Sequence, residues 1–128
     1  MTKMELREAY WIKKNIEKLE ERLADLRAVA VKTPDIIKIQ GVPHAGDKTA
    51  DIVSKIVDLE REIEQQLEKY YECIRRIEKA IEKLPAREAL LIRLRYIENK
   101  NWYEIAYEMN YSWRQVHNIH AEALKMLA

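Results

Sequence analysis

Three polar side chains near the C-terminal end of the chain have the chemistry needed to recognise the edges of DNA bases. Arg114, Gln115 and Asn118 follow one another at helical spacing. Arginine can donate two parallel hydrogen bonds to guanine, and the amide of Gln or Asn can donate one hydrogen bond to adenine and accept one from it. These side chains can read bases only if a helix presents them to a major groove.

The helix that carries these residues is predicted to begin after Ser112. Ser112 and Gln115 have capping-box spacing, in which each side chain bonds the backbone N–H of the other residue. An apolar stripe at helical spacing follows, made of Val116, Ile119, Ala123, Leu124 and Leu127. From this arrangement we expect the DNA-contacting residues to be Ser112, Trp113, Arg114, Gln115, His117 and Asn118.

A short helix is predicted immediately before this one, with a tight turn between them. Asn101 and Glu104 form another capping-box pattern at its start. Asn110 marks its end, because asparagine tolerates the left-handed conformation that often terminates a helix. Ala106 supplies the small side chain that two closely crossing helices require. The pair is typical of a helix-turn-helix.

A third helix is expected before this pair, starting near Pro85. Its inward positions are predicted to be Leu90, Leu91, Leu94 and Ile97. Lys100, in the loop that follows, is expected to contact no more than a DNA phosphate.

The order of these segments carries a family resemblance. Leu84–Ala89, Leu94–Tyr96, Glu104–Ala106, Ser112–Val116 and Ala121–Leu127 are similar to region 4 of bacterial primary sigma factors. The whole chain resembles the ArpU-type, sigma region 4-like regulators of phages and prophages in Gram-positive bacteria. The resemblance implies control of late phage genes through double-stranded DNA. The chain departs from the sigma pattern at Trp113, His117 and His120, where charged residues are usual.

The first two thirds of the chain are predicted to form two long helices. The first has an apolar seam made of Ala9, Ile12, Ile16, Leu19, Leu23, Leu26 and Ala30. The second has a seam made of Ile52, Ile56, Leu59, Ile63, Gln66, Tyr70, Cys73, Ile77, Ala80 and Leu84. We therefore expect an all-α fold, with a long antiparallel helical hairpin (a coiled coil) over 1–84 and the helix-turn-helix domain over 85–128.

A loop is expected over residues 31–50, because both glycines and two of the three prolines fall there. Within it, residues 35–39 are interpreted as either a short strand or a partner-binding segment. The second long helix also carries an extra apolar stripe made of Val53, Leu67, Ile74 and Ile81. One facing helix does not need so wide a stripe, so we expect a homodimer.

Several aromatic and histidine side chains allow two interpretations. Trp113 either stacks on a thymine methyl or sugar, or packs on the neighbouring helix. Trp102 and Tyr103 either contact phosphate or pack in the core or at its rim. His117 and His120 have a spacing that is compatible with metal binding, but we interpret them as surface histidines.

Composition excludes several classes of protein. With 128 residues, 35% of them charged, a net charge of +1 and one cysteine, the chain is expected to be globular and helical, without an internal disulfide. We expect no signal peptide, no membrane span and a cytoplasmic location in a bacterial host cell. No catalytic, cofactor-binding or metal motif is found, so we do not expect an enzyme.

Three functions are consistent with these patterns. The favoured one is a dimeric, sequence-specific transcriptional regulator that reads DNA with the helix after Ser112. The alternative is a sigma-like adaptor that docks on RNA polymerase or another protein. A phage DNA-packaging subunit is the weaker third possibility.

Overall fold

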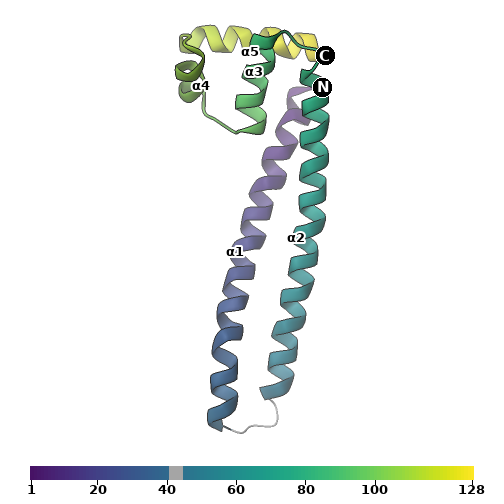
Figure 1. Ribbon diagram of the computed structural model, residues 1–128, viewed down its shortest axis with the longest axis vertical. Coiled ribbons are helices and arrows are strands. Elements are labelled where there is room, and N and C mark those ends of the chain that lie inside the picture. Colours follow the sequence, from purple (N-terminus) through teal and green to yellow (C-terminus); the bar gives the residue numbers. More distant parts are fainter. Residues whose placement is uncertain (41–44) are drawn as a thin grey trace. The chain divides into compact units, whose positions relative to one another are not determined.

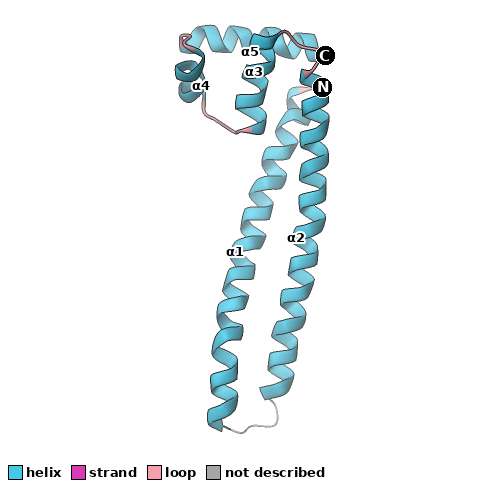
Figure 2. Ribbon diagram, in the orientation of Figure 1, coloured by secondary structure: helices cyan, strands magenta, loops and turns pink. Residues whose placement is uncertain are grey.

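The protein is all-α, as the sequence predicts. The computed structural model describes the backbone of residues 1–40 and 45–128, and the side chains of 1–32 and 49–128. The elements are α1 (Lys3–Gln40), α2 (Ala45–Ile81), α3 (Ala86–Ile92), the π-helical segment η1 (Arg93–Ile97), α4 (Trp102–Met109) and α5 (Trp113–Leu127) (Figures 1 and 2). None of the helices in these ranges is both long and apolar enough to cross a bilayer.

The two long helices extend into the segment that was expected to be a loop. α1 continues to Gln40 and α2 begins at Ala45. The loop prediction is therefore wrong for residues 31–40 and 45–50, and so is the strand considered for 35–39. A proline inside a helix removes one backbone N–H donor, and α1 accommodates Pro34 at that cost. Gly46 lies in the first turn of α2, where N–H groups have no intrahelical acceptor, so it does not interrupt the helix.

The rest of the expected loop, residues 41–44, lies outside the described residues. The interpretation of 35–39 as a partner-binding segment concerns side chains that are also outside the described ones.

The chain divides into two compact units. One consists of Met1–Lys13 together with Lys69–Ala128, and the other of Lys14–Glu68. The domain boundary expected between residues 84 and 85 lies inside the first unit. The C-terminal helices therefore share a unit with the N-terminal end of α1 and the C-terminal end of α2.

The first unit has a single apolar core. Leu6 and Ala9 of α1 are buried in it, and α2 contributes Cys73, Ile77 and Ile81. The C-terminal helices add Leu91, Ile92, Leu94, Tyr96, Ile105, Ala106, Val116, Ile119 and Ala123. Burial of these apolar side chains is the main force that holds α3, α4 and α5 in place.

The second unit consists of facing segments of α1 and α2. Ile16 and Leu23 are buried on α1, and Leu59 and Ile63 on α2. Every residue of the two predicted seams is buried or half-buried. The helical hairpin is therefore confirmed.

The extra apolar stripe on α2 is only partly exposed to solvent. Ile81 is buried in the core of the first unit and Ile74 packs against that core. Val53, in contrast, is 50% exposed, and Val57 beside it is 47% exposed.

Replacement of Leu6 by alanine tests whether the core of the first unit is shared. Leu6 is fully buried, so we expect Leu6→Ala to lower the stability of this unit by about 2–5 kcal/mol. Trp11, Trp102 and Trp113 all lie in the first unit. Urea unfolding followed by tryptophan fluorescence therefore reports on it. Leu26→Ala, in the second unit, is the matched control, and an unchanged fluorescence midpoint for Leu6→Ala would contradict the shared core.

Candidate DNA-binding surface

The turn between α4 and α5 has the tight geometry of a helix-turn-helix. Asn110 adopts the left-handed conformation, with φ 58° and ψ 38°. The N–H of Tyr111 donates to the carbonyl of Ala106 over 3.0 Å, as in a Schellman motif. Ala106 is buried in the core, as a small residue at the helix crossing should be. These features confirm the predicted turn.

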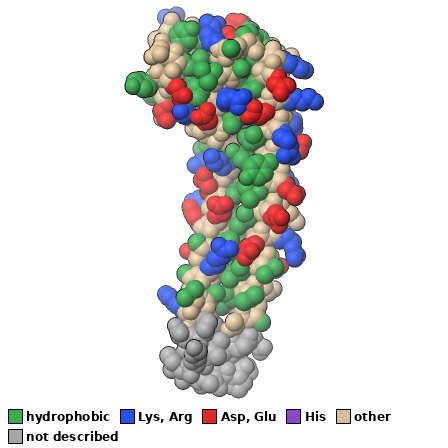
Figure 3. Space-filling view, in the orientation of Figure 1, with side chains coloured by type: hydrophobic (Ala, Val, Ile, Leu, Met, Phe, Trp, Pro, Cys, Tyr) green, Lys and Arg blue, Asp and Glu red, His purple; other side chains and the backbone are tan. Residues whose placement is uncertain are grey.

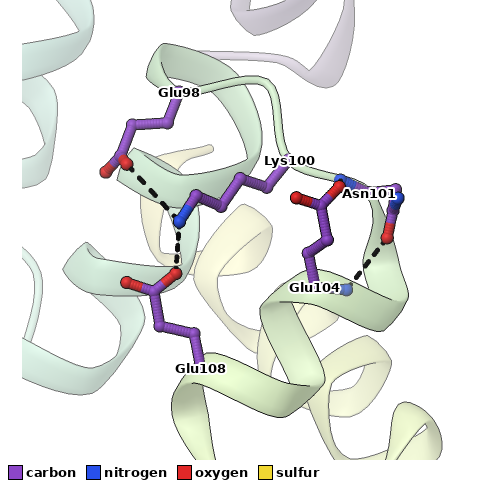
Figure 4. Close-up of polar contacts among 5 residues, drawn as sticks. All are labelled: Glu98, Lys100, Asn101, Glu104 and Glu108. Atoms are coloured by element: carbon purple, nitrogen blue, oxygen red, sulfur yellow. Dashed lines mark hydrogen bonds and ion pairs between the residues drawn. The ribbon is translucent and has the colours of Figure 1, made fainter.

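Both predicted capping boxes are present. At the start of α4, the N–H of Glu104 donates to Asn101 Oδ1 over 2.9 Å, and the N–H of Asn101 donates to Glu104 Oε1 over 3.3 Å (Figure 4). At the start of α5, the corresponding bonds between Gln115 and Ser112 measure 3.1 and 2.8 Å. These bonds fix where each helix begins.

The helix before the motif differs from its prediction. Pro85 is the residue before α3 rather than its first residue. After Ile92 the backbone widens into η1, which the apolar spacing did not indicate. Leu90 was expected to face inward, but it is 41% exposed while Leu91 is fully buried. Adjacent residues on a helix point about 100° apart, and the buried arc of α3 takes in Leu91 and Ile92 and leaves Leu90 outside it.

The outward face of α5 presents the polar residues that the sequence indicated. Arg114, Gln115 and Asn118 are exposed, whereas Val116 and Ile119 are buried. The Gln115 Oε1 atom already accepts a hydrogen bond from the N–H of Ser112. Gln115 therefore cannot offer both of its amide groups to a base without breaking the cap, which leaves Arg114 and Asn118 as the bidentate candidates.

His117 does not belong to this outward face. Its ring centroid lies 3.9 Å from that of Trp113 and 4.2 Å from that of Trp102. The ring is half-buried, and its Nε2 atom is buried without a hydrogen-bond partner among the described residues. The interpretation of His117 as a surface histidine is therefore wrong, because the two tryptophans cover its ring.

Trp113 and Trp102 both contribute to this aromatic cluster. Trp113 is 49% exposed and packs on His117 of its own helix, and its role toward DNA stays a prediction. Trp102 is half-buried against His117 and His120, so it packs in the core rim. Tyr103 is 76% exposed and does not share that packing.

His120 is also buried, contrary to its interpretation as a surface residue. Its Nε2 atom lies 2.6 Å from the hydroxyl of Tyr96. Burial lowers the pKa of His120 to about 4, and the positive charge of Lys3 acts in the same direction. The imidazole is therefore neutral near pH 7 and serves as a packed, hydrogen-bonded core residue.

Most cations around the motif are already paired with carboxylates. Lys100 Nζ lies 2.5 Å from Glu108 and 3.8 Å from Glu98 (Figure 4). The hydrogen bond to Glu108 raises the pKa of Lys100. The other pairs are Arg87 with Glu88 at 2.8 Å, Arg93 with Glu78 at 2.7 Å and Lys125 with Glu122 at 3.7 Å. Arg114 has no ion-pair partner in the described part of the chain.

Arg87 is a neighbour of the outward face that the sequence patterns did not indicate. With Tyr111, it lines a shallow hollow that also includes Gln115 and Asn118 of α5. The Arg87 guanidinium binds Glu88, and this hydrogen bond raises the pKa of Arg87. No sequence signal links α3 to this face, because the two are brought together only by packing. Within the described residues, no group of three or more His, Cys, Asp or Glu residues could hold a metal ion.

The buried His120 makes stability depend on pH. In the unfolded chain its pKa is close to 6.5, whereas in the folded protein it is about 4. As the pH falls through this window, the unfolded state takes up a proton that the folded state does not. We therefore expect His120 to cost about 1.4 kcal/mol of stability per pH unit between these values.

Denaturant unfolding of the wild type and of His120→Gln between pH 7 and pH 4.5 measures this dependence. The wild type should lose stability more steeply than the variant, which lacks the titrating group. Parallel curves for the two proteins would rule out the contribution of His120.

Comparison with known families agrees with the geometry of the C-terminal helices. Residues 80–128 match the family model described as Sigma-70, region 4. No curated protein and no solved structure was found to match the chain. The matched segment includes α3, η1, α4 and α5, whereas α1 and most of α2 lie outside it. The C-terminal part of the chain is therefore a sigma region 4-like helix-turn-helix.

Proposed function

We propose that this protein is a phage-type, sequence-specific transcriptional regulator that reads the DNA major groove with the first turns of α5. The observation that carries this proposal is the exposed pair of Arg114 and Asn118. They lie one helical turn apart on one face, and neither side chain has a hydrogen-bond partner among the described residues. The Arg114 guanidinium can donate two hydrogen bonds to a guanine, and the Asn118 amide can donate one to an adenine and accept one from it.

The start of α5 supports this role. The capping box at Ser112 fixes the first turn of the helix, and the buried side chains of Val116 and Ile119 fix its rotation. The N-terminal end of a helix carries a partial positive charge, which favours approach to DNA phosphates. In helix-turn-helix proteins the residues near this end reach the base edges.

A dimer would compensate for the weak positive charge of the domain. Since the other cations from Arg87 to Lys125 are paired or stacked, one domain offers few contacts to phosphates. Two copies that bind two half-sites double these contacts. Val53 and Val57 are exposed one turn apart on α2 and are the proposed contact between copies.

The alternative function is docking on RNA polymerase or another protein, and it has one specific observation in its favour. Tyr103 and Tyr107 lie one turn apart on α4 and are 76% and 87% exposed. Exposed tyrosines are common in protein interfaces. No described feature favours a DNA-packaging role.

Alanine substitutions on α5 test base recognition. Arg114→Ala and Asn118→Ala should each weaken binding to the specific site by about 1–3 kcal/mol and relax the preference at particular base pairs. Lys125→Ala is the matched control, since it removes an exposed charge from the opposite end of the same helix. The measurement is a titration of each protein against specific and scrambled duplexes at several salt concentrations.

Equal losses on both duplexes for Arg114→Ala and Asn118→Ala would contradict direct base reading by α5. If Tyr103→Ala then abolished polymerase binding, the docking alternative would replace the proposal.

A double substitution tests the proposed dimer. Val53→Glu with Val57→Glu places two charges on an exposed apolar face, so we expect it to convert a dimer into a monomer without unfolding the helices. Ser54→Glu with Lys55→Glu is the control on an adjacent exposed part of α2. Light scattering at micromolar concentration measures the mass, and a monomeric wild type would refute the dimer.

A further inference from the structure

We infer that the first unit contains a binding site for a phosphate group, separate from the outward face of α5. The site is a hollow of about 180 Å³, well above the roughly 10–15 Å³ that a cavity needs to hold one water molecule. It is lined by Arg7 and Tyr10 of α1, Arg95 and Tyr96 of η1, and Asn99 and Asn101 of the following turn. This lining contains two cations and no carboxylate.

Neither of the two arginines has an ion-pair partner among the described residues, and Arg114 is the other arginine of the first unit of which this is true. Arg76, Arg87 and Arg93 all bind a glutamate at 3.5 Å or less. Arg7 and Arg95, in contrast, converge on the hollow with their charges uncompensated. Two like charges that face a common space favour an anion between them.

Aromatic rings hold both guanidinium groups in place. The Arg95 guanidinium lies 4.5 Å from the centroid of the Trp102 ring, and its Nη1 donates to the carbonyl of Lys100 over 3.1 Å. The Arg7 guanidinium lies 5.5 Å from the ring centroid of Trp11. Such contacts fix a guanidinium without neutralising it, and they leave other N–H groups available to a ligand.

Tyr96 lies within reach of both positive charges. Burial raises the pKa of the Tyr96 hydroxyl, and the positive charges of Arg95 and Arg7 oppose this rise. The backbone of Asn99 has a φ of 57°, so the chain turns sharply at the edge of the hollow. The turn places two asparagine side chains on the same lining as the two arginines.

A phosphate group fits this set of donors better than a carboxylate does. Two guanidinium forks from different helices, together with two amides, supply more N–H donors than two carboxylate oxygens need. A phosphate group presents three strong acceptor oxygens and up to two negative charges. The phosphate can come from a small molecule or from a DNA backbone, because Asn101 caps the first helix of the motif.

Two of the six residues that line this site lie outside the sigma-like segment. Arg7 and Tyr10 belong to α1, whereas the family match covers only residues 80–128. The site therefore exists only where α1 packs beside η1 in the first unit. It also does not depend on the proposed base reading by α5, so the two proposals can be tested separately.

Calorimetric titration of the full chain with inorganic phosphate at pH 7.5 and constant ionic strength tests the site. We expect saturable binding, and Arg7→Gln should weaken it by at least about tenfold, because hydrogen bonds to a charged group are lost. Arg75→Gln, which alters an exposed arginine outside the hollow, should leave the affinity unchanged. Circular dichroism of each variant in chloride buffer checks the fold.

Absence of saturable binding, or equal phosphate affinity for the wild type and Arg7→Gln, would overturn the site. Arg95→Gln should match Arg7→Gln in phosphate affinity, and a difference in its melting temperature would report separately on the lost Trp102 contact.

A scrambled DNA duplex distinguishes the two sources of phosphate. If the ligand is a DNA phosphate, Arg7→Gln should reduce the salt dependence of duplex binding by about one ion, and inorganic phosphate should compete with the duplex. If the ligand is a small molecule, duplex binding should stay unchanged while phosphate affinity falls. Loss of duplex affinity in Arg7→Gln with unchanged inorganic phosphate affinity would overturn the site.

Discussion

Burial of one apolar core in the first unit is the constraint on which the candidate site depends. Leu6 of α1 and Ile77 of α2 are buried together with Ile92 of α3 and Val116 of α5. None of the three short C-terminal helices has enough apolar surface to be stable alone, because isolated helices of this length are marginal in water. Packing against the ends of the long helices fixes them, and it thereby determines which face of α5 is outward.

The two histidines inside this unit are accommodated in different ways. His120 is buried as a neutral ring on the Tyr96 hydroxyl, and the His117 ring is covered by Trp102 and Trp113. The contacts of Trp102 with His117 and of Tyr96 with His120 join α5 to α4 and to η1. Because an imidazole that stays neutral avoids the cost of burying a charge, it is compatible with a mainly apolar core.

Charge compensation decides where the unit can bind anions. Ion pairs neutralise four of the seven arginines in the first unit, and Figure 3 shows acidic and basic side chains intermixed on the surface. Arg114 on α5 and the pair Arg7 and Arg95 are the arginines of this unit without carboxylate partners among the described residues. They lie at the proposed base-reading face and at a separate hollow, while the net charge of the chain is only +1.

Features that depend on residues three to five positions apart could be predicted from the amino-acid sequence alone. Both capping boxes, the left-handed Asn110 and the apolar seams were predictable, because the groups that interact lie on the same turn or repeat at the helical period. For the same reason the exposure of Arg114 and Asn118 followed from the stripe that opposes them on α5.

Features that require contacts between distant segments could not be predicted from the sequence and are known from the fold. Periodicity could not tell that Leu91 rather than Leu90 enters the core, or that tryptophans cover His117. It gave no sign that α1 continues past Pro34, because a proline inside a helix removes a backbone hydrogen bond and clashes with the preceding turn, which favours a helix end in a sequence-based prediction. The meeting of Arg7 with Arg95 joins residues far apart in the chain, and packing of α1 beside η1 alone brings their charges together.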